Sequence, residues 1–162
     1  MQIFNPSASF TRPADTTAYA IGDLVANSVT AGSVVPLTFT LGNSFGVASF
    51  RLTRARLSKT GTTATNANFR LHLYQSAPVP ANGDNGAWST SQGANWLGNI
   101  DITSMLAFTD GCCGTGSAAA GSEMFIRTAS GGTVFGLLEA KAAYTPASGE
   151  VFTVTLEEVD DF

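Results

Sequence analysis

Short runs of alternating apolar and polar residues recur along this chain, and most of them are closed by glycine, proline or asparagine. The clearest is residues 69–74, in which the apolar side chains fall at every second position, and residues 151–159 keep this spacing from Phe152 to Leu156. A period of two is that of an extended strand with one buried face, whereas an amphipathic helix repeats its apolar residues every three to four positions. A short helix is conceivable only at residues 101–108. The chain is therefore predicted to be all-β.

The runs amount to about eight strands in a single domain spanning residues 1–162. Eleven phenylalanines, in a chain that is 44% hydrophobic, supply ample apolar surface for a core between two sheets. Eight antiparallel strands of uneven length with long end loops favour a jelly-roll β-sandwich, with an immunoglobulin-like sandwich as the alternative. The alternation slips between Arg54 and Leu57, which predicts a β-bulge. Residues 1–28 are expected to form an extended N-terminal arm or an edge-strand segment, because Pro13 removes a ladder donor.

Composition narrows the classes of function. Charged residues make up 12% of the chain, about half the usual share, which indicates a surface made to meet another surface. A net charge of −4 argues against direct binding of nucleic acid, and no apolar run is long enough to span a membrane. One histidine and two cysteines offer little for catalysis, so we expect a non-enzymatic protein without a cofactor. The first residues lack the pattern of a secretory signal, which predicts a protein that stays in the cytoplasm where it is made.

Three short motifs have both a chemical and a simpler structural interpretation. Cys112 and Cys113 are adjacent, so an ordinary disulfide between them is not expected, and they lie in a run of small residues, 111–121, that reads as a loop. Residues 82–86 are rich in oxygen ligands like a calcium loop, but they lack a downstream bidentate glutamate, and a tight turn is preferred. His72 is expected on the outward face of a strand without a carboxylate to orient it, which disfavours catalysis. No metal site is predicted.

The charges are unevenly distributed along the chain. Five of the eight positive charges lie within twenty residues, namely Arg51, Arg54, Arg56, Lys59 and Arg70. Negative charges gather near the C-terminal end, at Glu150, Glu157, Glu158, Asp160 and Asp161. The two groups could pair between subunits or with a partner, and the alternatives are an ordinary charged sheet face and a solvated tail.

Residues 9–28, which read SFTRPADTTAYAIGDLVANS, together with residues 69–74 (FRLHLY) and the segment 77–88, resemble the head decoration, or cement, proteins of tailed bacteriophages. Proteins of this family are encoded beside the major capsid protein. The resemblance implies a β-sandwich on the outer capsid surface of the virion that stabilises the head by bridging neighbouring subunits of the major capsid protein. No catalytic residues carry over from it.

Such a protein gains affinity from many weak contacts, which self-association would multiply, as a trimer first and a dimer second. Contacts are expected along the N-terminal segment, the basic strands and the C-terminal tail, at Phe10, Arg12, Tyr19, Arg51, Arg54, Arg56, Arg70, Asp160, Asp161 and Phe162. The alternative function is a phage tail-fibre or carbohydrate-binding module, in which Tyr74, Trp88 and Trp96 would stack on sugar rings.

Overall fold

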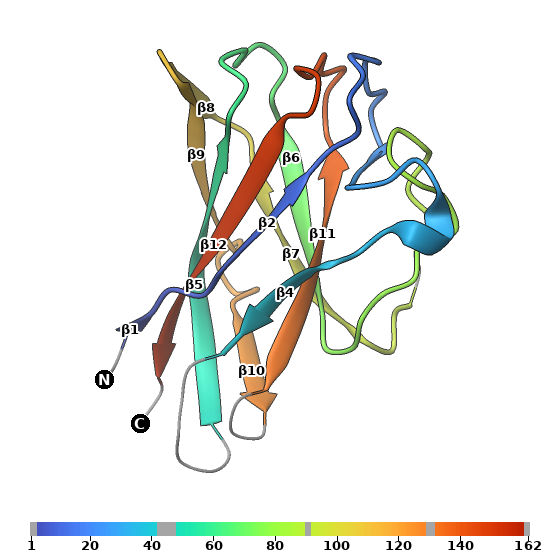
Figure 1. Ribbon diagram of the computed structural model, residues 1–162. Helices are drawn as coiled ribbons and strands as arrows, with labels where there is room; N and C mark the ends of the chain where they lie inside the picture. The colour runs from blue at the N-terminus through green and yellow to red at the C-terminus, as the bar shows by residue number, and fades with distance from the viewer. Residues whose placement is uncertain (1–2, 42–47, 90–91, 129–131, 161–162) are drawn as a thin grey trace.

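The computed structural model describes residues 3–41, 48–89, 92–128 and 132–160. Over these residues the chain forms two antiparallel sheets that pack face to face, and its only helical element is a 3-10 turn at Ala31–Ser33 (Figure 1). The predicted all-β sandwich is confirmed.

Each sheet is assembled from strands that are distant in sequence. The seven-stranded sheet contains β1 (Ile3–Phe4), β2 (Ser7–Thr11), β5 (Ala48–Lys59), β8 (Met105–Phe108), β9 (Gly111–Ser117), β10 (Met124–Thr128) and β12 (Val151–Asp160). The five-stranded sheet contains β3 (Leu24–Val25), β4 (Leu37–Thr40), β6 (Phe69–Tyr74), β7 (Trp96–Ile102) and β11 (Thr133–Ala140).

The order of pairing is that of a jelly roll. The seven-stranded sheet runs β2-β12-β5-β9 through its middle, and the five-stranded sheet runs β4-β11-β6-β7. Strands of the first half of the chain are therefore matched in nested order by strands of the second half: β2 with β12, β4 with β11, β5 with β9, and β6 with β7. This connectivity confirms the jelly-roll interpretation over the immunoglobulin-like one. The short strands β1, β3, β8 and β10 extend this frame of eight.

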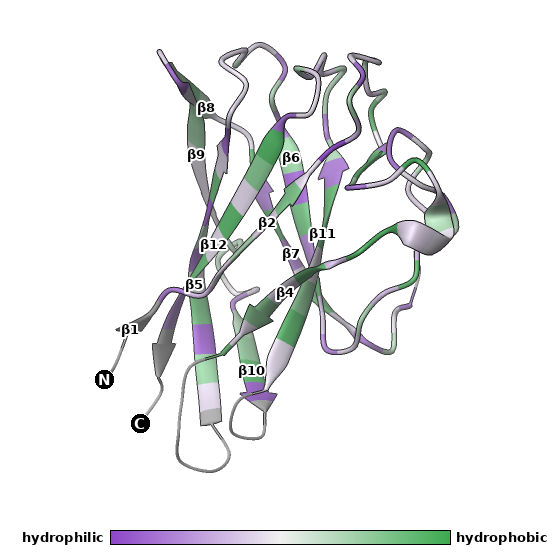
Figure 2. Cartoon of the chain, in the orientation of Figure 1, coloured by the Kyte–Doolittle hydropathy of each residue, from purple (hydrophilic) through white to green (hydrophobic). Residues whose placement is uncertain are grey.

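Side chains that point between the sheets form one continuous core. The Phe69 ring of β6 lies edge-on to Phe152 of β12 and to Tyr144, with ring centroids 5.4 Å apart in both pairs. Hydrophobic segments alternate with polar ones along β5 and β12, as a strand with one buried face requires (Figure 2). A core shared by both sheets makes the described chain a single structural unit.

The predicted bulge lies in β5. Leu52 is opposite Glu158 and Arg54 is opposite Glu157, so Thr53 is the extra residue, directly before the predicted segment. The Thr53 hydroxyl donates a hydrogen bond of 2.9 Å to the backbone oxygen of Glu157. The extra residue restores the phase of the apolar positions, so that Leu52 and Ala55 both face the core.

Two local predictions are wrong. Residues 111–121, expected to be a loop, contain strand β9, and the possible helix at residues 101–108 is instead the end of β7 followed by β8. The glycines of β9 allow it to pass close to other backbone: a Cβ at Gly116 would lie 2.2 Å from the carbonyl oxygen of Asp101. The small residues therefore mark a close approach between strands.

The N-terminal segment is built into the sandwich. β2 pairs with β12 along its length, which matches the edge-strand version of the prediction for residues 1–28. β2 and β4 are the outer strands of the two sheets on the same side of the molecule, and a groove of about 400 Å³ lies between them. Phe10 lines this groove, half-buried, with its ring stacked on Phe152 at 5.4 Å.

Candidate interaction surface

The outer face of the seven-stranded sheet presents hydroxyl groups in register. Ser9 is opposite Thr153, with the two side-chain oxygens 3.0 Å apart, and Ser7 is opposite Thr155, with 3.1 Å between the oxygens. Antiparallel pairing causes this match, because directly opposed residues of neighbouring strands share a face. Where β2 pairs with β12, this face is therefore polar but uncharged.

Three exposed apolar side chains lie on the same face. Leu106 is paired with the exposed Cys113, Phe108 is on the same side of β8 as Leu106, and Phe125 is paired with the exposed Arg51. The exposed fraction of the Phe125 side chain is 68% and that of Leu106 is also 68%. Large apolar groups set among uncharged polar ones are typical of a protein-binding surface. We call this surface the outer sheet face, defined by Ser7, Ser9, Arg51, Arg54, Arg56, Leu106, Phe108, Cys113, Thr115, Phe125, Thr153, Thr155 and Glu157.

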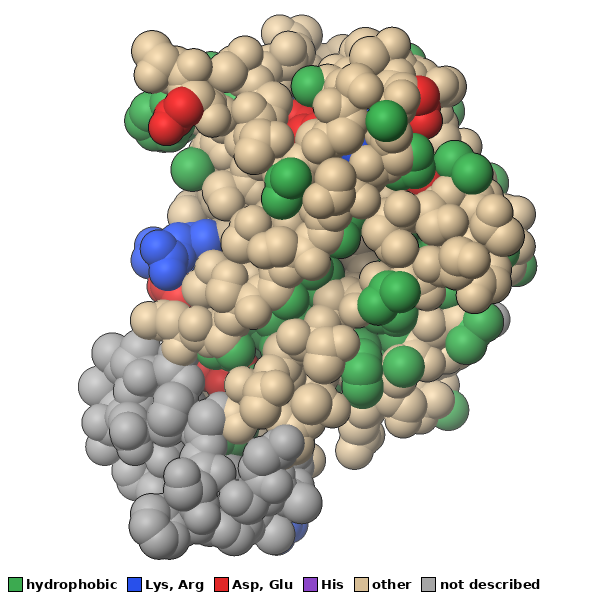
Figure 3. Space-filling view, in the orientation of Figure 1, with side chains coloured by type: hydrophobic (Ala, Val, Ile, Leu, Met, Phe, Trp, Pro, Cys, Tyr) green, Lys and Arg blue, Asp and Glu red, His purple; other side chains and the backbone are tan. Residues whose placement is uncertain are grey.

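Arg51, Arg54 and Arg56, predicted as contact residues, all lie on the outer sheet face. Glu157 accepts hydrogen bonds from Arg54, at 2.7 and 2.9 Å, and its carboxylate is 2.8 Å from Nε of Arg56. The bonds from Arg54 lower the pKa of Glu157 below its ordinary value. A group of basic side chains stands out at the left of Figure 3 from a surface of mostly uncharged atoms. Glu157, one of the five acidic residues expected to pair between subunits or with a partner, is thus already paired within the chain.

Arg70 is separated from the other arginines because β6 belongs to the opposite sheet. Its guanidinium forms a two-point ion pair with Asp101 on β7, with Nη2 2.8 Å from Oδ2. Lys59 is buried, and its ammonium group contacts Glu150 at 3.0 Å and the backbone oxygens of residues 61 and 63 at 2.8 Å. The five positive charges that are close in sequence therefore do not form one basic surface.

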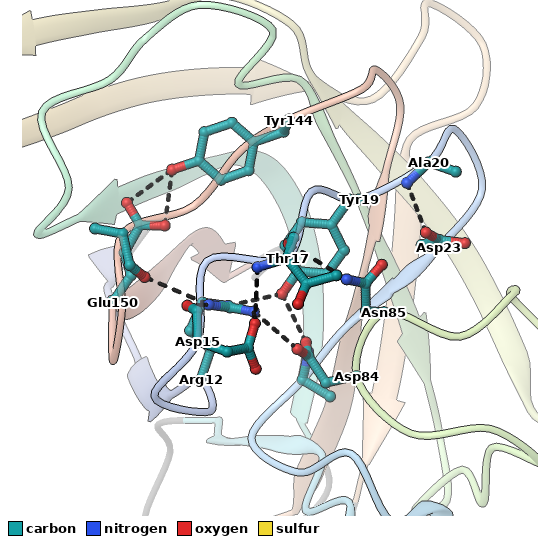
Figure 4. A network of polar contacts seen from close by, with 12 residues as sticks. Arg12, Asp15, Thr17, Tyr19, Ala20, Asp23, Asp84, Asn85, Tyr144 and Glu150 are labelled. Atoms are coloured by element: carbon teal, nitrogen blue, oxygen red, sulfur yellow. Dashed lines mark hydrogen bonds and ion pairs between the residues drawn. The ribbon is translucent and has the colours of Figure 1, made fainter.

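Arg12 and Tyr19 face the interior, and their side chains are not exposed for contact with a partner. Tyr19 donates a hydrogen bond of 2.7 Å to Asp84, and Arg12 donates to Tyr19 at 2.9 Å and to Asp84 at 3.2 Å (Figure 4). The backbone amide of Ala26 also donates to Asp84, at 2.8 Å. Burial raises the pKa of Asp84, and these bonds oppose that rise. The network ties the segment after β2 to the loop at residues 82–86.

The same network accounts for the oxygen-rich composition of the loop at residues 82–86. Its single carboxylate, Asp84, points inward, and both of its oxygens accept bonds from the protein. Asn82 donates instead to the carbonyl oxygen of Ala87 at 2.8 Å, as in a turn. Within the described part of the chain, His, Cys, Asp and Glu side chains do not gather in groups of three that could hold a metal ion.

His72 has a carboxylate neighbour that the sequence did not indicate. Glu139, on the adjacent strand β11, lies 2.8 Å from its Nε2 atom. The imidazole ring also stacks on Trp88, with centroids 4.2 Å apart, and burial lowers the pKa of His72. Glu139 lies two positions along β11 from Leu137, the residue opposite His72, so only the pairing of β6 with β11 brings the two side chains together.

The remaining predicted residues lie at the C-terminal end. Asp160 is the last residue of β12 and pairs with Phe50 of β5. Asp161 and Phe162 lie outside the described residues. Cys112 points inward and Cys113 outward, on opposite faces of β9, and both thiols are free.

Comparison with known proteins does not assign this chain to a family. Neither a scan against protein-family models nor a search of curated proteins found a match to this chain. Among the described residues, no helix is long and apolar enough to cross a membrane.

Proposed function

We propose that this chain is a structural virion protein that binds the outer surface of a phage capsid and stabilises it by bridging neighbouring subunits of the major capsid protein. The proposal starts from the resemblance of residues 9–28, 69–74 and 77–88 to head decoration proteins. The outer sheet face is the surface that would meet the capsid, and its composition is the observation that carries the proposal.

The dimensions of the outer sheet face suit a stable protein contact. β5 has twelve residues, which at about 3.3 Å per residue gives a length of about 40 Å. Five strands lie side by side from β2 to β8, which at a spacing of about 4.8 Å gives a width of about 24 Å. Because β2, β8 and β9 are shorter than β5, the area of the face is on the order of 700 Å², close to the roughly 800 Å² that each partner buries in a standard interface.

The chemistry of the outer sheet face also fits a contact with the capsid surface. Phe108 and Phe125 would act as apolar anchors, while the hydroxyl rows of β2 and β12 would bond to backbone groups of the capsid protein. Arg51 and the Arg54–Arg56–Glu157 group lie on the inner strands β5 and β12 and would set orientation and association rate more than affinity. Self-association, as a trimer first and a dimer second, would place several such faces on one capsid.

Reconstitution on capsids tests the proposal. Expanded heads that lack this protein are incubated with the purified chain, and both saturable binding and the melting temperature of the heads are measured. Phe125→Asp and Phe108→Asp should each weaken binding at least tenfold, because a buried unpaired charge replaces an anchor. Val79→Asp is the matched control, since Val79 is an exposed apolar residue on the loop between β6 and β7. Head stability unchanged by the wild-type chain, or equal binding by all variants, would refute the proposal.

Substitution of single residues is a better test than removal of the N-terminal segment. Deleting residues 1–20 would remove β2 from the sheet together with Arg12 and Tyr19, which hold Asp84. The truncated chain would lose stability, and weaker binding would then not report on the capsid contact.

A further inference from the structure

A second hollow, of about 470 Å³, lies at the other side of the sandwich, along the outer edge of β7. Its volume is within the range of small-molecule sites, roughly 300–1,000 Å³. One wall is formed by β7 and the other by residues 117–124, which run from the end of β9 to the start of β10. From Trp96 to Asp101 the strand extends about 16 Å, so both ends of a short, elongated ligand could be contacted.

Trp96 lines this hollow with an exposed indole. Its exposed fraction is 44%, whereas Trp88 is half-buried and stacked on His72. Tyr74, the third aromatic residue considered for sugar stacking, is buried. Of these three aromatic residues, Trp96 alone therefore presents a broad apolar ring to a ligand.

Polar groups, three of them uncharged, surround the rest of the hollow. Asn99 contributes an amide, and Ser117 and Ser122 contribute hydroxyls. Among the described residues, neither serine hydroxyl nor the Glu123 carboxylate has a hydrogen-bond partner, so all three are available to a ligand. Asp101 also borders the hollow, but its charge is balanced by the ion pair with Arg70.

We propose that this hollow is a binding site for a neutral saccharide, with one sugar ring stacked on Trp96 and its hydroxyl groups bonded to Asn99, Ser117, Ser122 and Glu123. The C–H face of a sugar ring is apolar and its rim carries hydroxyls, so it matches an aromatic face bordered by groups that both donate and accept. The site is distinct from the outer sheet face, and the inference does not depend on capsid binding.

The charges in the hollow decide between ligand classes. Glu123 and Asp101 disfavour phosphates, nucleotides and acidic sugars, and the guanidinium of Arg70 beside Asp101 is already engaged in their ion pair. A quaternary ammonium ligand would need several aromatic rings around it, and among the described residues Trp96 is the single aromatic one that lines the hollow. A neutral ligand with many hydroxyls is the class that remains.

A glycan array that covers neutral hexoses, N-acetylhexosamines, deoxyhexoses and sialylated glycans tests the inference on the full chain. We expect binding to at least one neutral glycan, followed in solution by quenching of tryptophan fluorescence. Trp96→Ala should weaken that binding about tenfold or more, as expected for the loss of a stacked ring. Glu123→Ala should also weaken it.

Ile21→Ala is the control, because Ile21 is an exposed apolar residue between β2 and β3 that does not line the hollow, and its replacement should leave glycan affinity unchanged. Circular dichroism of each variant shows whether the fold is kept. Absence of any neutral glycan among the ligands, preference for choline or sialylated probes, or full affinity in Trp96→Ala would overturn the proposal. These results are independent of the head-binding assay, so one proposal can fail while the other stands.

Discussion

Replacing Glu158 should remove a large part of the pH dependence of stability. This side chain lies on the core face of β12, and its exposed fraction is 0%. Neither of its carboxylate oxygens has a hydrogen-bond partner among the described residues. Burial raises the pKa of Glu158 from an ordinary 4.5 to about 8, because the ionised form loses its hydration and gains no counter-charge.

The sign and size of the effect follow from this pKa. Between about pH 4.5 and about pH 8 the unfolded chain is ionised at this position while the folded chain keeps its proton. The folded state then binds more protons, so the free energy of unfolding falls as the pH rises. Each pKa unit corresponds to about 1.4 kcal/mol, which gives a loss of up to about 5 kcal/mol, complete above about pH 8.

Urea denaturation from about pH 5 to about pH 9 measures this loss. Glu158→Gln cannot ionise, so its free energy of unfolding should change much less than that of the wild type over this range. Glu157→Gln is the matched control on the next residue: the pKa of Glu157 is lowered by Arg54, so Glu157 is ionised throughout the range and its replacement should leave the pH slope unchanged. Parallel curves for the wild type and Glu158→Gln would show that this carboxyl is not held neutral.

Two further substitutions test the packing of the loops. Arg12→Met leaves Asp84 without its buried cation, and it should lower the free energy of unfolding by about 3–5 kcal/mol in urea denaturation; a loss below about 1 kcal/mol would contradict a buried, charged network. Gly83→Ala should cost about 1–3 kcal/mol, because a Cβ there would lie 2.1 Å from the backbone oxygen of Val29. Gly32→Ala, whose Cβ would meet nothing within 4 Å, serves as its control, and equal melting temperatures for the two variants would argue against that close approach.

Local sequence pattern was sufficient where one face of a strand is buried. The alternation in residues 69–74 and 151–159 predicted β6 and β12, and the slip near Arg54 predicted a bulge within one residue of its position. It failed for β9, where glycines are required by the approach of a strand from elsewhere in the chain. Nothing in residues 111–117 themselves reveals that neighbour.

The predicted contact residues show the same difference between what local pattern determines and what long-range pairing determines. Arg51, Arg54 and Arg56 share a face because one strand carries them, and period two with a bulge was enough to group them. Arg70 is on the other sheet, and Arg12 is buried because Asp84, 72 residues away, accepts its hydrogen bond. Long-range pairing of this kind leaves no signal in a single sequence. Polar residues that are buried in the folded chain are therefore predicted to be exposed.

The nested strand order has a consequence for how the chain folds. β6 and β7 join residues such as Arg70 and Asp101, only 31 positions apart, while β6 and β11 join His72 and Glu139 across 67. Ser9 and Thr153, in β2 and β12, are 144 positions apart. Closing a short loop first shortens the remaining loops, so among the four nested pairs the entropy cost is lowest when β6 and β7 pair first and pairing spreads outward from them. The outermost pair, β2 with β12, would then form last and open first.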